Sequence, residues 1–229
     1  MPAHIFVDNS NIFAGARRAA ERFEPNVVSR AVRVHYRNLF RLVESRHNNI
    51  ASRVMAGSVP PGNEDLWRYA QEAGYSTDLL TKIENDEGRL GEQAVDEILH
   101  LKIANALLDF SGYQTLVLVT GDGRETPVKT SFPQQVRRAL KKQWYVEVWS
   151  WKRQLSGVFR RIADDAGHDM TIHELDRWYK QITFVQAGDY DIRGQAVCVS
   201  GRVVQRLVGE APYLVDARAH AATIDEHRT

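Results

Sequence analysis

Two apolar segments of the sequence lead to an aspartate that is followed by small or polar residues. Residues 4–8 end in Asp8, and residues 116–119 run into a short loop that contains Asp122. Runs of β-forming residues of this kind are typical of buried parallel strands, and open α/β sheets bind ligands at the carboxyl edge of such strands. Because a buried strand holds its last residue rigidly, acids from two strands can share a metal ion. The sequence therefore predicts a site at this edge.

The overall composition limits the chemistry of such a site. The chain has 229 residues, of which 43% are hydrophobic, and a formal net charge of +1, as expected for one globular α/β domain with a small appendage. The single Cys198 excludes an internal disulfide, and the eight histidines show no metal-ligand spacing. We therefore expect any metal to be a hard cation held by oxygens. The near-zero net charge argues against a protein coated in nucleic acid but allows local basic patches.

The longest apolar runs, such as residues 116–119, are far too short to cross a bilayer. The N-terminus also lacks a basic segment followed by an apolar stretch. The sequence thus predicts a cytoplasmic protein without a membrane partner.

Strand-like and helix-like segments alternate along most of the chain, which predicts an α/β fold with a mostly parallel sheet wrapped by helices in a domain of residues 1–186. Residues 187–229 contain short apolar segments broken by glycine and proline, and they predict a small β-rich C-terminal extension and tail. Strands of the main domain are expected at residues 4–8, 52–57, 76–83, 116–119 and 145–149, and helices around residues 32–43, 63–73, 92–109, 133–142 and 154–164.

The helix expected at residues 92–109 supplies a third acid. Its apolar stripe should face the sheet, and Asp96 lies beside that stripe in the first turns of the helix. Glu92 lies four residues earlier on nearly the same face. Either acid could lean over the edge of the sheet, or both could simply complement the positive N-terminus of the helix.

Three motifs together resemble the NYN domain family, a branch of the PIN-like nucleases. They are residues 6–11 (FVDNSN), residues 93–96 (QAVD) opening a helix, and residues 119–123 (VTGDG) following a strand. They occur in the family's order, and the resemblance covers about residues 3–185. It implies a three-layer α/β/α sandwich, a divalent-metal site and RNA cleavage.

The chemistry that this resemblance implies is hydrolysis of RNA phosphodiesters. Asp8, Asp96 and Asp122 would hold Mg²⁺ or Mn²⁺, which makes a water nucleophilic and stabilises the charge of the transition state. The chain would then be a metal-dependent ribonuclease with RNA as its partner.

The third motif departs from the family pattern. Related nucleases often continue it as Gly-Asp-Ser-Asp, whereas Arg124 stands here where the second Asp would be. Glu125 could replace the missing acid. Arg124 could grip the scissile phosphate, the role that we favour, or it could occupy the place of a second metal and suppress activity.

Further residues could support catalysis or hold the RNA. Asn9, Asn11 and Thr120 could orient a water or contact the substrate, or they could only cap a helix and form a turn. Lys and Arg contact phosphates and exposed aromatic rings stack on bases. We therefore expect RNA contacts from basic residues around the edge and from Trp149 and Trp151, although Trp149 could instead lie in the core. The basic candidates are Arg17, Arg18, Lys129, Arg137 and Lys152.

Two other function classes fit the sequence. A catalytically silent RNA-binding or scaffold protein could retain this fold, with Arg124 as its best argument. A phosphatase using Asp8 as nucleophile usually needs a second Asp two residues on, where this chain has Ser10. Residues 187–229 carry no evident chemistry, and a packing or homo-oligomerisation role is expected for them.

Overall fold

The computed structural model describes residues 1–59, 64–81, 93–124 and 130–207. Its centre is a six-stranded sheet in the order β4-β3-β1-β5-β6-β7, and all neighbouring strands in it are parallel. The predicted mostly parallel sheet is thus confirmed. The strands are β1 (Ala3–Asp8), β3 (Ile50–Val59), β4 (Ser76–Thr81), β5 (Thr115–Val119), β6 (Tyr145–Ser150) and β7 (Met170–Glu174).

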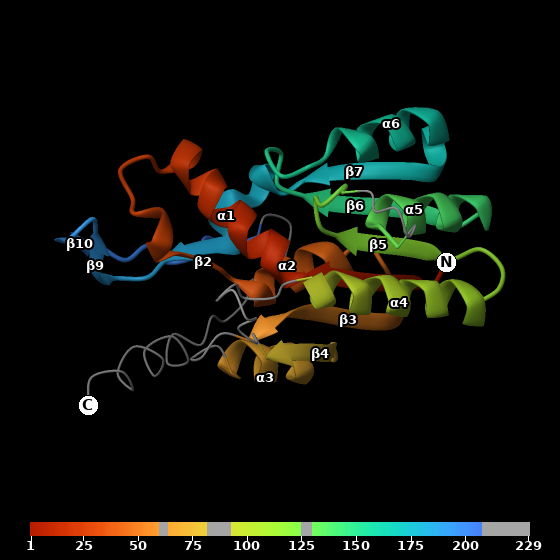
Figure 1. Cartoon of the computed structure of the whole chain (residues 1–229), viewed down its shortest axis with the longest axis horizontal. Helices are drawn as coiled ribbons and strands as arrows, with labels where there is room; N and C mark the ends of the chain where they lie inside the picture. Colours follow the sequence, from red (N-terminus) through yellow and green to blue (C-terminus); the bar gives the residue numbers. More distant parts are fainter. Residues whose placement is uncertain (60–63, 82–92, 125–129, 208–229) are drawn as a thin grey trace.

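Helices cover both faces of the sheet, so the described chain forms the expected three layers (Figure 1). Consecutive residues of β1 point to opposite faces of the sheet: Ile5 packs in one core with Ile12, and Phe6 packs in the other with Leu99. The first core contains α1 (Asn9–Phe23), α2 (Tyr36–Glu44) and α3 (Glu64–Glu72), and the second contains α4 (Gln93–Asp109), α5 (Phe132–Lys141) and α6 (Gly157–Ala166).

The region expected to be one helix over residues 32–43 is instead a strand followed by a helix. Val32 lies in β2 (Val32–Val34), which pairs antiparallel with β8 (Thr183–Val185). The helix α2 starts only after His35, whose ring accepts a hydrogen bond from the amide of Asn38. The helical prediction was wrong for Val32 because its partner strand lies far away in the sequence, whereas residues 36–43 do have helical spacing.

In the central sheet and its flanking helices the other bounds lie close to the prediction, with one strand of that sheet missed. α6 starts at Gly157 rather than residue 154 because the Ser156 side chain caps it. The last strand of the sheet, β7, was not predicted, and residues 82–83 lie outside the described residues. Short elements complete the chain: η1 (Ser29–Ala31), η2 (Gly167–Asp169), η3 (Leu175–Trp178) and α7 (Tyr179–Ile182).

The predicted C-terminal β appendage is a hairpin of β9 (Gly188–Ile192) and β10 (Gln195–Val199). Residues beyond it return to the main body, where Arg202 pairs with Val185 in an isolated bridge and binds Glu24 through two nitrogens at 2.7 and 3.0 Å. Burial alone would raise the Glu24 pKa, but hydrogen bonds from Arg202 and Tyr179 lower the pKa below its ordinary value. The rest of the predicted C-terminal extension, residues 208–229, lies outside the described residues.

Among the helices of the described residues, none is both long and apolar enough to cross a membrane.

Helix α1 is hydrogen-bonded to the loop after β6 and packs tightly against it. The Trp151 indole nitrogen donates to the carbonyl oxygen of Ile12 at 2.9 Å. A Cβ on Gly15 would lie within 3.0 Å of the Trp151 ring. Because Trp151 is fully buried, the ring cannot move aside without disturbing the core.

We therefore predict that Gly15→Ala destabilises the protein by about 1–2 kcal/mol, since the cost of overpacking exceeds the gain in helix propensity. Gly157→Ala is the matched control, because its Cβ would meet only the end of Arg161 at 3.7 Å. The control should be neutral or stabilising by about 0.5 kcal/mol. Urea unfolding of both variants measures the difference, and an equally stable Gly15→Ala would contradict the packing described here.

Candidate active site

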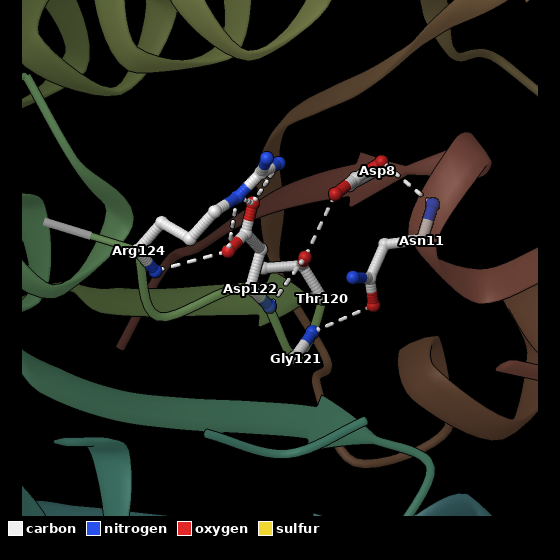
Figure 2. Close-up of polar contacts among 6 residues, drawn as sticks. All are labelled: Asp8, Asn11, Thr120, Gly121, Asp122 and Arg124. Carbon is white, nitrogen blue, oxygen red and sulfur yellow. Dashed lines mark hydrogen bonds and ion pairs between the residues drawn. The ribbon is translucent and has the colours of Figure 1, made fainter. Parts of the chain in front are cut away.

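Asp8 is the last residue of β1 and is only 2% exposed. By strand alternation it lies on the same face as Phe6, the face covered by α4. One carboxylate oxygen accepts from the Asn11 amide at 3.0 Å and so caps α1, and the other accepts from the Thr120 hydroxyl at 2.8 Å (Figure 2). Both oxygens of this buried carboxylate are therefore hydrogen-bonded.

Thr120 connects Asp8 to Asp122. Strands β1 and β5 are parallel neighbours with Val7 opposite Val119, so the next residues along each strand, Asp8 and Thr120, meet at the carboxyl edge. The Thr120 hydroxyl donates to Asp8 and also accepts from the Asp122 amide at 3.2 Å. The structure thus brings two of the three predicted acids to one edge through a single hydroxyl.

Asn9 and Asn11 hold neighbouring segments to the site. The Asn11 side-chain oxygen accepts from the Gly121 amide at 2.9 Å, and the Asn9 oxygen accepts from the buried Tyr36 hydroxyl. Burial, and then the negative charge of Asp8, raise the Tyr36 pKa, so this phenol stays a donor. Neither asparagine is the helix cap, since Asp8 has that role. Sequence reasoning missed Tyr36 because it lies in a different helix.

The two glycines of the VTGDG motif allow close packing. A Cβ on Gly121 would lie within 3.0 Å of the Ser150 hydroxyl and the Gln154 backbone, and a Cβ on Gly123 within 3.0 Å of Ser156. The Ser156 amide also donates to the Gly121 carbonyl at 3.0 Å. These glycines thus seat the loop of Asp122 against residues 150–156.

Arg124 holds the carboxylate of Asp122. Its Nε and Nη2 lie 2.9 and 2.7 Å from one Asp122 oxygen, and its backbone amide donates to the other oxygen at 2.9 Å (Figure 2). The Asp122 side chain is 13% exposed and that of Arg124 is 81% exposed. A metal at Asp122 would compete with this ion pair, which can open readily toward solvent.

Asp96 lies in the first turn of α4, and α4 packs against β1, β3 and β4. Since α4 follows β4 in a parallel sheet, its N-terminus is at the same edge as Asp8. The Asp96 side chain, Glu92 and Glu125 lie outside what the structure describes.

The donor atoms at this edge suit a hard cation. Among the described residues, no three His, Cys, Asp or Glu side chains are grouped to hold a metal ion. Mg²⁺, however, often binds only one or two carboxylates plus water and substrate phosphates. Asp8 and Asp122 therefore fit such an ion in chemical type.

His100 is a further polar residue near this edge that the sequence did not reveal. It is buried in α4, its ring meets Phe132 edge-on at 4.4 Å, and neither ring nitrogen has a hydrogen-bond partner among the described residues. Burial lowers its pKa, while the charges of Glu97 and Asp122 act in the opposite direction. Its position one turn after Asp96 was the available signal.

The predicted RNA contacts are dispersed. The Arg17 guanidinium lies 4.3 Å from the centre of the Phe13 ring, and Arg18 binds the Gln154 side chain at 2.6 Å. Lys152 lies 4.0 Å from the Glu174 carboxylate, and Arg137 is exposed on α5. Lys129 lies outside the described residues.

Trp149 and Trp151 do not offer stacking surfaces. Each is 1% exposed, and the Trp151 indole nitrogen is bound inside the fold. The stacking prediction is therefore wrong for both tryptophans, and the alternative core position of Trp149 is right.

The sequence matches no protein-family model and no curated protein. The fold is similar to the crystal structure of VPA0982, a protein of unknown function from Vibrio parahaemolyticus RIMD 2210633. That similarity has a TM-score of 0.52 and 16% sequence identity, and it covers 76% of this chain and 94% of the other. At this identity it concerns the fold alone, and the NYN resemblance stays a prediction from three motifs.

The Thr120 hydroxyl, which bonds to both Asp8 and the Asp122 amide, allows a test of how much these hydrogen bonds stabilise the site. We predict that Thr120→Val destabilises the protein by about 2–3 kcal/mol, because a buried carboxylate oxygen loses its donor. Thr115→Val is the matched control in β5, the strand that leads to Thr120, since Thr115 is buried and its side chain makes no hydrogen bond among the described residues. Urea unfolding compares the two, and equal losses would show that the bond to Asp8 contributes nothing specific.

Proposed function

We propose that the protein is a ribonuclease that uses Mg²⁺ or Mn²⁺ to cleave RNA phosphodiester bonds. The observation that carries the proposal is the placement of Asp8 at the end of β1 and of Asp122 in the loop after the neighbouring parallel strand β5, at one edge and joined by Thr120. The position of Asp96 in the first turn of α4 supports it as the third acid. A cytoplasmic location and RNA as the partner belong to the same proposal.

The metal, when bound, would supply a nucleophilic water and stabilise negative charge on the reacting phosphate. The protein's own part is to hold its carboxylates still. Asp8 is fixed by the Asn11 amide and the Thr120 hydroxyl, and the Asp122 loop is fixed by the Gly121 amide on Asn11. Such rigid donors need little rearrangement during the reaction.

A silent RNA-binding scaffold is the second candidate. The observation in its favour is the ion pair in which Arg124 neutralises Asp122. In a scaffold this pair would be permanent, whereas in a nuclease it must open when the metal binds.

For the nuclease, Asp8→Asn should reduce cleavage at least about 100-fold, because the change removes a negative charge from the metal while keeping the shape of the side chain. The fold should persist, since Asn caps helices as well as Asp. The measurement is cleavage of a mixture of single-stranded and structured RNAs, with and without Mn²⁺.

RNA binding in EDTA should be retained by Asp8→Asn. Asp165→Asn is the charge-matched control, because Asp165 is exposed near the far end of α6, and it should cleave normally. If the wild type binds RNA but shows no metal-dependent cleavage of any RNA in the mixture, the scaffold replaces the nuclease.

Arg124→Gln should lower the Mn²⁺ concentration needed for half-maximal cleavage by about fivefold, because an exposed ion pair of about 1 kcal/mol no longer competes for Asp122. At saturating Mn²⁺ the rate should fall, and fall further in Arg124→Asp, if the guanidinium also grips the scissile phosphate. Metal titrations of the cleavage rate give both quantities. A higher rate in Arg124→Asp would instead identify Arg124 as an inhibitory replacement for the missing acid.

A further inference from the structure

Three arginines from separate segments gather beside α1. Arg17 lies on α1, Arg30 on η1 and Arg33 on β2, and α1 packs against both η1 and β2. The Arg33 guanidinium bonds to the carbonyl oxygens of Arg30 and Val32, the latter at 3.2 Å, so it is held over the η1–β2 segment. We call Arg17, Arg30 and Arg33 the arginine cluster.

No acid neutralises the arginine cluster among the described residues. Other arginines of the fold are paired, for example Arg53 with Glu44 at 3.0 Å and Arg202 with Glu24 at 2.7 Å. In contrast, the buried Nε of Arg17 has no hydrogen-bond partner in this part of the chain. Burial, followed by the charges of Arg33 and Arg30, lowers the Arg17 pKa. Three positive charges that influence one another in this way favour the binding of an anionic ligand.

Aromatic groups and the C-terminal hairpin border the cluster. Phe13 lies under the Arg17 guanidinium, and Tyr190 of β9 is close enough to influence Arg17 electrostatically. Strand alternation places Asp189 and Asp191 on the other face of the hairpin, where both are exposed. The acids of β9 therefore do not neutralise the cluster.

The cluster lies on the side of the molecule that carries the candidate active site. Helix α1 starts directly after Asp8, and Arg17 lies about 12 Å further along its axis. In Figure 1, α1, β2 and the β9–β10 hairpin all lie toward the end of the sheet to which the strand arrows point. An extended strand could therefore reach from the cluster to Asp8 along α1.

We propose that the arginine cluster binds backbone phosphates of a single-stranded RNA whose chain continues into the site of Asp8 and Asp122. Guanidinium groups suit this ligand because they bind phosphate oxygens in pairs and are weakly hydrated. The inference rests on the proposed function for the direction of the strand. Its contact with RNA can be tested without cleavage.

The test is the binding of a fluorescein-labelled 12-nucleotide single-stranded RNA, followed by anisotropy in EDTA over a series of salt concentrations. Arg30→Gln/Arg33→Gln removes two charges from the cluster. Each phosphate contact on single-stranded nucleic acid contributes about 0.7 to the slope of log K against log salt. We expect the slope to decrease by about 1.4 and binding at 0.1 M salt to weaken about 25-fold.

Arg138→Gln/Lys141→Gln is the charge-matched control, because these exposed residues lie in the last turn of α5, at the opposite edge of the sheet. It should retain wild-type affinity and slope. Circular dichroism melting checks that both variants fold, and Arg30→Gln alone, at an exposed position, should give half of the slope change if the double variant does not fold.

An unchanged slope in the cluster variant, or equal losses in the two double variants, would overturn the proposal. Displacement of the RNA by inorganic phosphate, at equal ionic strength and a phosphate concentration matched to the RNA phosphates, would also overturn it in favour of a small-anion site. These outcomes are independent of the nuclease, since cleavage by the wild type in Mn²⁺ is measured separately.

Discussion

The site depends on one constraint, which is that the buried carboxylate of Asp8 must have hydrogen-bond donors for its oxygens. An ionised carboxylate without partners is very costly in a protein interior. The donors here are the Asn11 amide, at the positive N-terminus of α1, and the Thr120 hydroxyl. The two hydrogen bonds to the Asp8 carboxylate therefore fix both the turn from β1 into α1 and the position of the chain after β5.

Further hydrogen bonds from the same residues position the rest of the chain at this edge of the sheet. Because the Thr120 hydroxyl also accepts a hydrogen bond from the Asp122 amide, the position of Asp122 depends on that of Asp8. Asn11 then holds Gly121, and the small size of Gly121 lets the loop rest on Ser150 and Gln154. The candidate active site is thus part of the packing between strands β1, β5 and β6, and its precision comes from the register of the sheet.

The sequence predicts those parts of the structure that local patterns determine. Strands β1 and β5 are buried on both faces, so their apolar runs identified them, together with the edge where Asp8 and Asp122 meet. Contacts between distant segments left no such pattern. The three-residue β2 exists through pairing with β8, Tyr36 reaches Asn9 from another helix, and Arg124 could not be placed on Asp122 from its position in the sequence.

The ion pair of Arg124 with Asp122 bears on both roles considered for this arginine. Without metal, the pair removes the repulsion that two neighbouring carboxylates would otherwise feel. On the proposed function, Asp122 would hold a divalent cation that supplies this neutralisation, and the Arg124 guanidinium would then be available to bind a substrate phosphate. Arg124 is the most exposed member of the network, so this exchange requires movement of one side chain and leaves the bonds around Asp8 intact. Arg124 would then have both roles in turn: it pairs with Asp122 before the metal binds, and it contacts the substrate phosphate afterwards.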